Sequence, residues 1–526
     1  MKISKILLSF ALLLILSVTT FHAQAQVEPL NPYNILTNRD LYPEHIWISE
    51  WIPETNELSY SQNYLSLEKK QYPKGNAIDI TSVVKLNAQI KQLDSLIAPL
   101  NMFPPIMWID KNSFRFVHNN HVFLYEVANS KLSILNSFST EAKNIDICPK
   151  TNVVAYTKDN NLYISNNSKE TQITFEENPN IVMCRYVHRE EFGIKNGSFW
   201  SPNGNLLAFY RMDESMVTDY PIVNTKTRIA ECTPIKYPMS GMNSHHVTIG
   251  IYNTNNQSLI YLKTGEPKEQ YLTSVTWSPD EKNIYVGLLN REQNHLKLNA
   301  YDATNGEFVK TLFEEKSDIY VEPQDPLYFI PKSDKFLWFS QRDGYRHLYI
   351  YKADGTIEKQ LTKGNWIVNE IVDFDKKNNT LYFNATKDSP IEKHLYSVNL
   401  KTEKIQKITK QAGTHETKPS PFFNYFVIET SSTEIPSEVK TIDKNGKTID
   451  VFIENKNHLA EIEMPETEIF TLKAEDGTDL YCRLIKPINF NPEKKYPVII
   501  YVYGGPHAQL ITNSWLAGAG LFLNYL

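Results

Sequence analysis

The sequence predicts a mainly β protein: an N-terminal β-propeller of about eight blades, followed by the start of an α/β domain. Three observations predict this fold. Short β-rich runs, separated by Asn, Asp, Gly, Lys and Pro, recur from about residue 45 to about residue 455. The motif Trp-Ser-Pro stands at equivalent places in two units, FWSPNGNLLAFYR (199–211) and TWSPDEKNIYVGL (276–288). After about residue 460 the repeats give way to a hairpin and a continuous apolar run.

The repeating units are typical of paired strands. NNLYISN (160–166), HLYIYKADG (347–355) and HLYSVNLKT (394–402) share a polar start, Leu-Tyr, alternation and a turn. QITF, QLTKG and KITKQ recur between the units. Alternation buries one face of a strand, and a spacing of roughly 40–60 residues suits one four-stranded blade. About 410 residues at about 50 per blade gives seven or eight blades. Stacked β-sandwiches are the alternative, and the repeated Trp-Ser-Pro favours radial repetition.

The charge pattern does not indicate nucleic-acid binding. The 526 residues carry a net charge of −6, both signs are spread along the chain, and no basic run is present.

The first 25 residues are typical of a secretory signal: Lys2 and Lys5, an apolar run over 6–18, and Ala-Gln-Ala at 23–25. That run is too short for a membrane span, which needs roughly 20 residues. We expect cleavage after Ala25, export to the periplasm or the extracellular space, and no membrane span in the mature chain.

Cysteine and histidine do not predict a metal site. The cysteines have no Cys-x-x-Cys spacing and stand at positions Cys148, Cys184, Cys232 and Cys482. We expect four buried thiols rather than a zinc site or disulfides. The adjacent His245 and His246 would diverge on a strand, so packing is favoured over metal ligation. No cofactor is expected.

The C-terminal part, 461–526, predicts the start of a second domain. Val498–Val502 is a fully apolar run, which indicates a strand buried on both faces. Gly504 and Gly505 follow, and then apolar residues at helical spacing: Leu516, Ala519, Leu523 and Leu526. A strand, a glycine loop and a helix form the first crossover of an α/β domain. A single such unit cannot bury both its faces, so we expect the sequence to be a truncated part of a longer protein.

Two segments resemble a known family. YPVIIYVYGGPHAQ (496–509) and YVHREEFGIKNGSFWSPNGNLLAFYRMDESMV (186–217) resemble the dipeptidyl peptidase IV branch of the prolyl oligopeptidase superfamily, peptidase family S9. The similarity is greatest to bacterial prolyl tripeptidyl peptidases and their dipeptidyl relatives. It implies a propeller over 26–460, the beginning of an α/β-hydrolase peptidase domain over 461–526, and a homodimer when full length. Family members carry a Gly-x-Ser-x-Gly-Gly serine, an Asp and a His, and no Gly-x-Ser-x-Gly occurs here.

The resemblance also implies site residues. It gives the Tyr503 phenol the role of an oxyanion-hole donor, where one such donor contributes about 2.7–4 kcal/mol. It gives Glu190 and Glu191 the role of holding the free amino terminus of a peptide, because carboxylates accept charge-assisted hydrogen bonds from an ammonium. Neighbouring strand residues point to opposite faces, so both acids reach one amine only from a turn or bulge. Arg211 and Asp213 are candidates to brace this site.

We therefore expect a secreted serine exopeptidase that releases N-terminal di- or tripeptides with proline at the cleavage position. Two glutamates resemble the dipeptidyl enzymes, whereas the surrounding residues resemble the tripeptidyl enzymes. In the complete enzyme a Ser attacks, a His moves the proton and an Asp orients the His. Without that triad, the chain alone is expected to be inactive. The alternative is a non-catalytic β-propeller that binds peptides or a protein.

Overall fold

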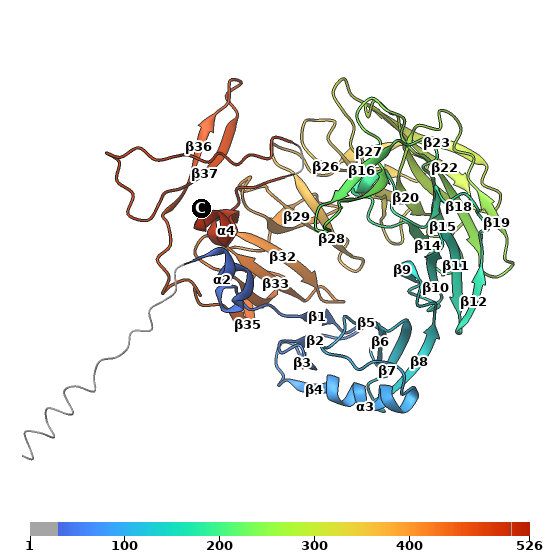
Figure 1. The fold of residues 1–526 in the computed structure, drawn as a ribbon, viewed down its shortest axis with the longest axis horizontal. Coiled ribbons are helices and arrows are strands. Elements are labelled where there is room, and N and C mark those ends of the chain that lie inside the picture. Colours follow the sequence, from blue (N-terminus) through green and yellow to red (C-terminus); the bar gives the residue numbers. More distant parts are fainter. Residues whose placement is uncertain (1–29, 506–507) are drawn as a thin grey trace, which may run out of the picture.

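Among the described residues, eight sheets of four or five strands follow one another along the chain and are arranged around a common centre (Figure 1). The computed structural model describes residues 30–505 and 508–526, and the predicted signal segment 1–25 lies outside them. Each sheet is built from one local stretch of sequence and is antiparallel, so each is one blade of an eight-bladed β-propeller. The predicted mainly β fold and its blade number are confirmed, and the stacked-sandwich alternative is wrong.

Within the described residues, blades 1 to 3 have four strands each and blade 4 has five. Their strands are β1 (Ile48–Trp51), β2 (Glu57–Ser61), β3 (Ser66–Gln71), β4 (Ile78–Ser82), β5 (Met107–Asp110), β6 (Ser113–His118), β7 (His121–Glu126), β8 (Lys131–Ser137), β9 (Lys143–Ile147), β10 (Val154–Lys158), β11 (Asn161–Asn166), β12 (Lys169–Gln172), β13 (Ile181–Met183), β14 (Ser198–Trp200), β15 (Leu206–Asp213), β18 (His246–Asn253) and β19 (Leu259–Tyr261). An added hairpin, β16 (Asp219–Asn224) and β17 (Glu231–Lys236), leaves blade 4 between β15 and β18.

Blades 5 to 8 have four strands each in the part of the chain that the structure describes. They are β20 (Tyr271–Trp277), β21 (Asn283–Leu289), β22 (His295–Asp302), β23 (Phe308–Lys316), β24 (Tyr328–Phe329), β25 (Lys335–Ser340), β26 (His347–Lys352), β27 (Ile357–Gln360), β28 (Val368–Asp375), β29 (Thr380–Ala385), β30 (His394–Asn399), β31 (Ile405–Lys407), β32 (Thr414–Pro419), β33 (Tyr425–Ser431), β34 (Glu438–Asp443) and β35 (Thr448–Glu454). The first strand of a blade lies toward the centre and the last toward the rim, as β9 and β12 show (Figure 1).

The core lies between neighbouring blades. Buried apolar clusters join each blade to the next around the ring. One further cluster closes the ring, where Trp51 and Tyr72 of blade 1 pack with Val427 and other residues of blade 8. At the same seam Lys70 Nζ lies 2.6 Å from Asp450, and the Tyr72 hydroxyl donates to that carboxylate over 2.9 Å. Side-chain packing and an ion pair therefore hold the first and last blades together.

The recurring Leu-Tyr and Ile/Leu-Thr motifs have one structural cause. In blades 3, 6 and 7 a threonine that follows the outer strand accepts a hydrogen bond from the backbone N–H of the leucine in the third strand. The donor–acceptor distances are 2.9 Å for Leu162 to Thr174, 3.0 Å for Leu348 to Thr362 and 3.1 Å for Leu395 to Thr409. The motif thus satisfies a buried backbone donor where the ladder ends.

Helices are few and short among the described residues. They are α2 (Pro32–Thr37), η1 (Arg39–Leu41), α3 (Val83–Leu93), η2 (His188–Gly193), η3 (Trp515–Gly518) and α4 (Leu521–Tyr525). Ser82 caps α3, and Leu86 and Ile90 on one face of that helix are buried against blades 1 and 2. The two ends of the described chain meet where Ile35 and Leu41 pack with Leu521.

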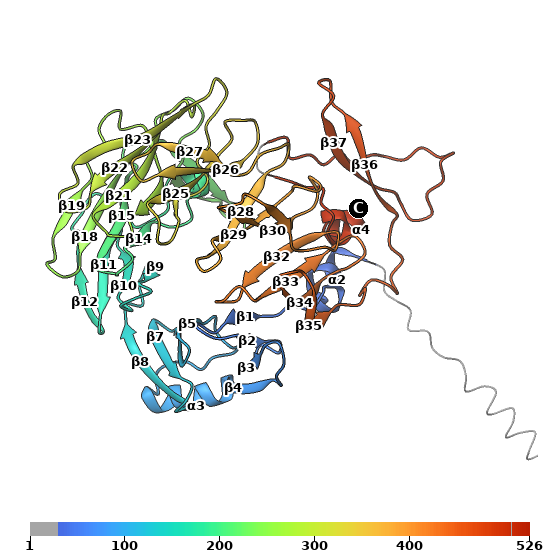
Figure 2. The ribbon, with the colours of Figure 1, turned by 180° about the vertical axis from the view of Figure 1, so that it is seen from behind.

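The C-terminal part differs from its predicted local structure. It begins with a hairpin, β36 (Thr467–Lys473) and β37 (Asp479–Ile485), which lies outside the ring of blades (Figure 2). Val498–Val502, predicted to be a buried strand, is irregular, and its residues are 63–83% exposed. A strand needs a hydrogen-bonded neighbour, and no described strand pairs with this segment. The predicted helix is two short helices, η3 and α4, because Ala519 and Gly520 between them have extended backbone angles.

The cysteine prediction is half right. All four thiols are unpaired, and Cys148 and Cys184 are buried. Cys232 on β17 is exposed and Cys482 on β37 is half-buried, because both hairpins lie outside the packed blades. None of the helices described here combines the length and the apolar character that a membrane crossing requires.

Candidate functional site

The predicted anchor segment is an excursion out of the first strand of blade 4. Its two halves, β13 and β14, both pair with β15, and residues 184–197 leave the sheet between them. The neck is closed where Cys184 N–H donates to the Tyr210 carbonyl and Tyr210 N–H donates to the Gly197 carbonyl, both over 2.9 Å. A Cβ at Gly197 would lie 2.0 Å from the Cys184 carbonyl oxygen. Only glycine therefore lets the two sides of the neck approach this closely.

Glu190 and Glu191 lie side by side in the η2 turn. Glu190 has left-handed backbone angles (φ 66°, ψ 7°), whereas Glu191 is extended (φ −60°, ψ 162°). Both residues are exposed, and neither carboxylate has a hydrogen-bond or ion-pair partner among the described residues. The structure confirms that this pair lies in a turn rather than in a strand. Two unpaired carboxylates are therefore presented together by a short, strongly bent segment.

A buried histidine pair holds the base of the turn. The Leu272 N–H donates to Nε2 of His188 over 3.2 Å, so Nδ1 of His188 carries the proton. That Nδ1 donates over 3.0 Å to Nε2 of His245, which also accepts from the His188 backbone N–H over 3.1 Å. Burial, then the charges of Arg185 and other cations, lowers the pKa of His245 to about 4. Burial and the neighbouring His245 hold the pKa of His188 well below 6.5.

The turn is also fixed against blade 5 and the segment after it. The Phe192 ring packs on Tyr271, the first residue of β20, with ring centroids 5.0 Å apart. Gly193 has φ +69°, and a Cβ there would lie 1.9 Å from the Gln324 carbonyl oxygen. The backbone bearing the two glutamates is thus locked between blade 4 and the chain that leaves blade 5.

A third acid behind the turn was not predicted from the sequence. Glu214, which follows β15, has a side chain only 9% exposed and lies 3.6 Å from the Arg185 guanidinium. Burial raises the pKa of this carboxyl, and the charges of Arg185 and Arg189 act in the opposite direction. The Arg189 guanidinium stacks over the Tyr237 ring at 4.3 Å, just beyond the β16–β17 hairpin. Sequence position gave no signal for Glu214, because only the fold brings it to these arginines.

The two predicted bracing residues do not contact the glutamate pair. Arg211 forms an ion pair with Glu176 at 2.9 Å, and Asp213 accepts the Ser215 N–H over 2.9 Å. Both belong to β15, where their hydrogen bonds join blade 4 to neighbouring loops. Arg185 and Arg189 belong to the excursion itself, and Arg185 pairs with Glu214 behind it.

Tyr503 lies on an irregular and exposed segment. Its residue is 58% exposed, and in the described part of the chain its hydroxyl makes no hydrogen bond. Gly504 has φ +66°, and a Cβ at Gly505 would lie 2.9 Å from the Tyr503 ring. The two glycines therefore let the backbone turn sharply beside the phenol. In the part of the chain that the structure describes, no contact joins Tyr503 to Glu190 or Glu191, so the structure does not itself bring the three residues together.

The anchor turn and the C-terminal segment lie on the same face of the ring. In each blade the start of the first strand, the end of the second and the start of the third meet at one face, as the pairs Tyr271–Leu289 and Thr414–Ser431 show. The turn packs on Tyr271, at the start of β20. Trp515 N–H donates over 3.0 Å to the Ser431 hydroxyl, at the end of β33.

The described residues contain no group of three or more His, Cys, Asp or Glu arranged to hold a metal ion. His245 is buried with His188 and His246 is half-buried on β18, so the prediction that this histidine pair serves packing agrees with their contacts.

Comparison with known proteins gives one consistent result. Residues 106–437 match the family described as the dipeptidyl peptidase IV (DPP IV) N-terminal region. Dipeptidyl peptidase 4 of Trichophyton rubrum is 27% identical over 437 residues, which cover 78% of this chain and 56% of that protein. A probable dipeptidyl-aminopeptidase B of Coccidioides posadasii is 27% identical over 494 residues, covering 84% of this chain and 53% of that protein. The chain thus spans about half the length of these curated relatives.

Two solved structures share the fold. A Bacteroides ovatus ATCC 8483 protein, provisionally assigned as a dipeptidyl aminopeptidase IV, superposes with a TM-score of 0.84 and 37% identity. The match covers 92% of this chain and 71% of that one. Porphyromonas gingivalis dipeptidyl peptidase 4 superposes with a TM-score of 0.77 over 93% of this chain and 71% of its own. Its identity is 21%, so this likeness concerns the fold alone.

Proposed function

Because this chain belongs to the dipeptidyl peptidase IV N-terminal region family, we propose that it is the substrate-selecting part of a serine exopeptidase. The enzyme would release di- or tripeptides from the free amino terminus of a peptide, with proline at the cleavage position. The propeller would fix the amino terminus, and Tyr503 would stabilise the transition state.

One observation carries the proposal: two unpaired carboxylates stand on a rigid turn, on the face where the C-terminal segment docks. A peptide ammonium offers three donors, and each charge-assisted bond to a carboxylate contributes roughly 1.5–3 kcal/mol. An anchor at a fixed place sets the distance from the amine to the scissile bond. The close backbone packing at Gly193 and Gly197 supports this role, because it fixes the segment that carries the two glutamates.

In this proposal the chemistry is acyl transfer to a serine. The serine attacks the carbonyl, a histidine moves the proton, and an aspartate orients the histidine. The Tyr503 hydroxyl would donate to the carbonyl oxygen as negative charge develops there. No Gly-x-Ser-x-Gly stands in the 526 residues, and the proposal assigns the nucleophile to none of them.

A fluorophosphonate probe tests the reaction class, because it labels only an activated serine. We expect the complete enzyme to be labelled and this 526-residue chain alone to remain unlabelled. Absence of labelling on both would refute the enzyme and favour a non-catalytic propeller that binds peptides. Such a module would keep amine-dependent binding through Glu190 and Glu191.

Chromogenic Xaa-Pro and Xaa-Xaa-Pro substrates test the length of the released peptide on the complete protein. Glu191→Gln is expected to raise KM about tenfold or more for the preferred substrate, because one charge-assisted bond is lost. Gln is the matched replacement, since it keeps the shape and removes the charge. An unchanged KM for both substrates would remove Glu191 from the anchor.

We also infer export and self-association. The first 25 residues fit a secretory signal, and mass spectrometry of the mature amino terminus is expected to find cleavage after Ala25. The β16–β17 hairpin exposes Ile222, Val223 and Ile229, which are 45%, 56% and 82% accessible. An exposed apolar hairpin suits a homodimer contact. Light scattering of the complete protein is expected to give twice the monomer mass, and a monomer would refute this.

A further inference from the structure

Two equivalent histidines in blades 6 and 7 are held in the same way. His347 and His394 begin the third strands β26 and β30, and both are fully buried. Nδ1 of His347 lies 3.0 Å from the Thr362 hydroxyl, and Nδ1 of His394 lies 3.1 Å from the Thr409 hydroxyl. Each hydroxyl oxygen already accepts a leucine N–H, so its hydrogen is free to donate to Nδ1. The imidazole is then neutral, and its Nε2–H donates outward.

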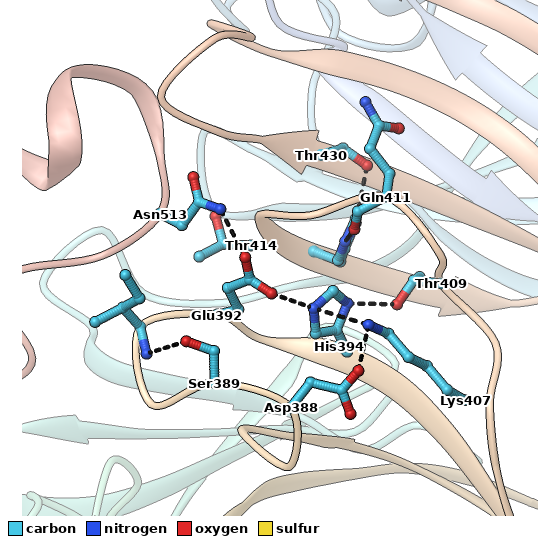
Figure 3. A network of polar contacts seen from close by, with 12 residues as sticks. Asp388, Ser389, Glu392, His394, Lys407, Thr409, Gln411, Thr414, Thr430 and Asn513 are labelled. Atoms are coloured by element: carbon cyan, nitrogen blue, oxygen red, sulfur yellow. Dashed lines mark hydrogen bonds and ion pairs between the residues drawn. The ribbon is translucent and has the colours of Figure 1, made fainter.

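The acceptor for that outward donor differs between the two blades. In blade 6, Nε2 of His347 donates over 2.8 Å to the Gly364 carbonyl. In blade 7, Nε2 of His394 instead lies 2.8 Å from a carboxylate oxygen of Glu392. The second oxygen of Glu392 accepts from the Asn513 side-chain amide over 2.7 Å (Figure 3). In blade 7, where the C-terminal segment contacts the third strand's histidine through Glu392, a carboxylate thus replaces the backbone carbonyl of blade 6.

Asn513 makes further contacts with the propeller. Its backbone N–H donates over 2.7 Å to the Ile391 carbonyl, next to Glu392. Its side-chain oxygen accepts the Thr433 N–H over 3.2 Å, in the turn after β33. All three polar groups therefore hold the segment to blades 7 and 8. This residue follows Tyr503 by ten positions in the sequence.

The charges around Glu392 favour its ionised form. Burial acts to raise the pKa of this carboxyl, but the hydrogen bonds from His394 and Asn513 outweigh it and hold the pKa below its ordinary value. Burial lowers the pKa of His394, so this ring stays neutral despite its acidic neighbour. Lys407 pairs with Asp388 at 2.7 Å, its Nζ lies 3.3 Å from Nε2 of His394, and its charge also acts to lower the pKa of Glu392.

We propose that Glu392 is a positioning residue, which joins the buried His394 of blade 7 to Asn513 and so fixes the segment after Tyr503 on the propeller. The functional role of this contact rests on the proposed function: the contact would keep Tyr503, the oxyanion donor, at a set place relative to Glu190 and Glu191. The bridge itself is a property of this chain and needs no catalysis.

Hydrogen–deuterium exchange of the whole 526-residue chain tests the bridge. Glu392→Ala and Asn513→Ala are expected to speed exchange in residues 513–518 about tenfold or more, while β29 and β30 keep their protection. Glu392→Gln should restore most of the protection, because its oxygen still accepts from Asn513. Its amide then donates to Nε2 of His394, whose proton moves to Nδ1 and is accepted by the Thr409 hydroxyl. Glu416→Ala is the matched control: it removes a neighbouring exposed carboxylate that pairs with Lys393 and should change nothing at 513–518.

Two results would overturn the proposal. Exchange in residues 513–518 that is unchanged in Glu392→Ala shows that the bridge does not hold the segment. Acceleration spread over blades 7 and 8, unrescued by Gln, shows a general loss of stability instead. Hydrogen exchange requires no peptidase activity, so a negative fluorophosphonate result would refute the enzyme and leave the bridge standing. Conversely, unchanged exchange in Glu392→Ala together with fluorophosphonate labelling would refute the bridge and leave the enzyme standing.

Discussion

Acid should destabilise the protein through His245, the residue beneath the glutamate turn. Its pKa is about 4 in the folded chain, against 6.5 for an unburied histidine. Below pH 6.5 the unfolded chain therefore binds a proton that the folded chain refuses until about pH 4. Stability from this group is complete above pH 6.5 and falls as the pH is lowered. Between pH 6.5 and 5 the loss is about 2 kcal/mol, at about 1.36 kcal/mol per pH unit.

Differential scanning calorimetry at pH 7 and pH 5 measures this effect. The entropy of unfolding is about 2.1 cal/mol/K per residue, or about 1 kcal/mol/K for a chain of this length, so His245 accounts for about 2 °C of the acid shift in Tm. His245→Gln keeps an acceptor for His188 and removes the titration, so its acid shift should be smaller by that amount. His415→Gln on blade 8 should behave similarly, because burial also lowers the pKa of His415 to about 4. An acid shift in His245→Gln equal to that of the wild type would refute the assignment.

Three other changes test separate parts of the account. Gly193→Ala places a methyl 1.9 Å from the Gln324 carbonyl oxygen, so it should weaken the binding of free-amine peptides about tenfold, as measured by titration calorimetry. The control is Gly265→Ala, which has a similar φ and an open Cβ position and should leave this binding unchanged. Asp450→Asn should lower the free energy of unfolding by about 1–3 kcal/mol, because Lys70 and Tyr72 lose their shared charged partner where the ring closes. The control is Asp479→Asn, in the exposed pair with Lys473, which should cost less than about 0.5 kcal/mol. Equal losses in the two variants would contradict this. Thr362→Val should cost about 1–3 kcal/mol by leaving the Leu348 N–H unpaired, with the exposed Thr402→Val as the near-neutral control; a neutral Thr362→Val would sink the explanation of the repeated motif.

The sequence contained enough information for the ring of blades. Alternation and turn spacing are local properties, and the repeated Trp-Ser-Pro and Leu-Tyr motifs recur because each blade solves the same hydrogen-bonding problem. The glutamate turn was predictable for a similar reason, since two adjacent acids can share one ligand only when the strand is broken. The left-handed angles of Glu190 and the closed neck at Gly197 confirm that the strand is broken there, and the shared ligand stays a prediction.

The residues around the glutamate turn could not be predicted, because their positions depend on contacts between segments far apart in the sequence. Glu214 reaches Arg185, and His188 reaches His245, only because β13, β15 and β18 lie side by side in blade 4. Arg211 was misassigned because the sequence that follows the turn says nothing about Glu176, its partner in the structure. The predicted strand at Val498–Val502 failed for the opposite reason: an apolar run becomes a strand only when another strand supplies hydrogen bonds.

Titration calorimetry of this chain with one proline-containing peptide, in free-amine and N-acetylated forms, tests the central claim most directly. The account predicts that the free amine binds about 100-fold or more tightly, because two charge-assisted bonds to Glu190 and Glu191 are lost on acetylation. Replacing both residues by glutamine should remove the difference. Equal affinities of the two peptides for the wild-type chain would contradict the account.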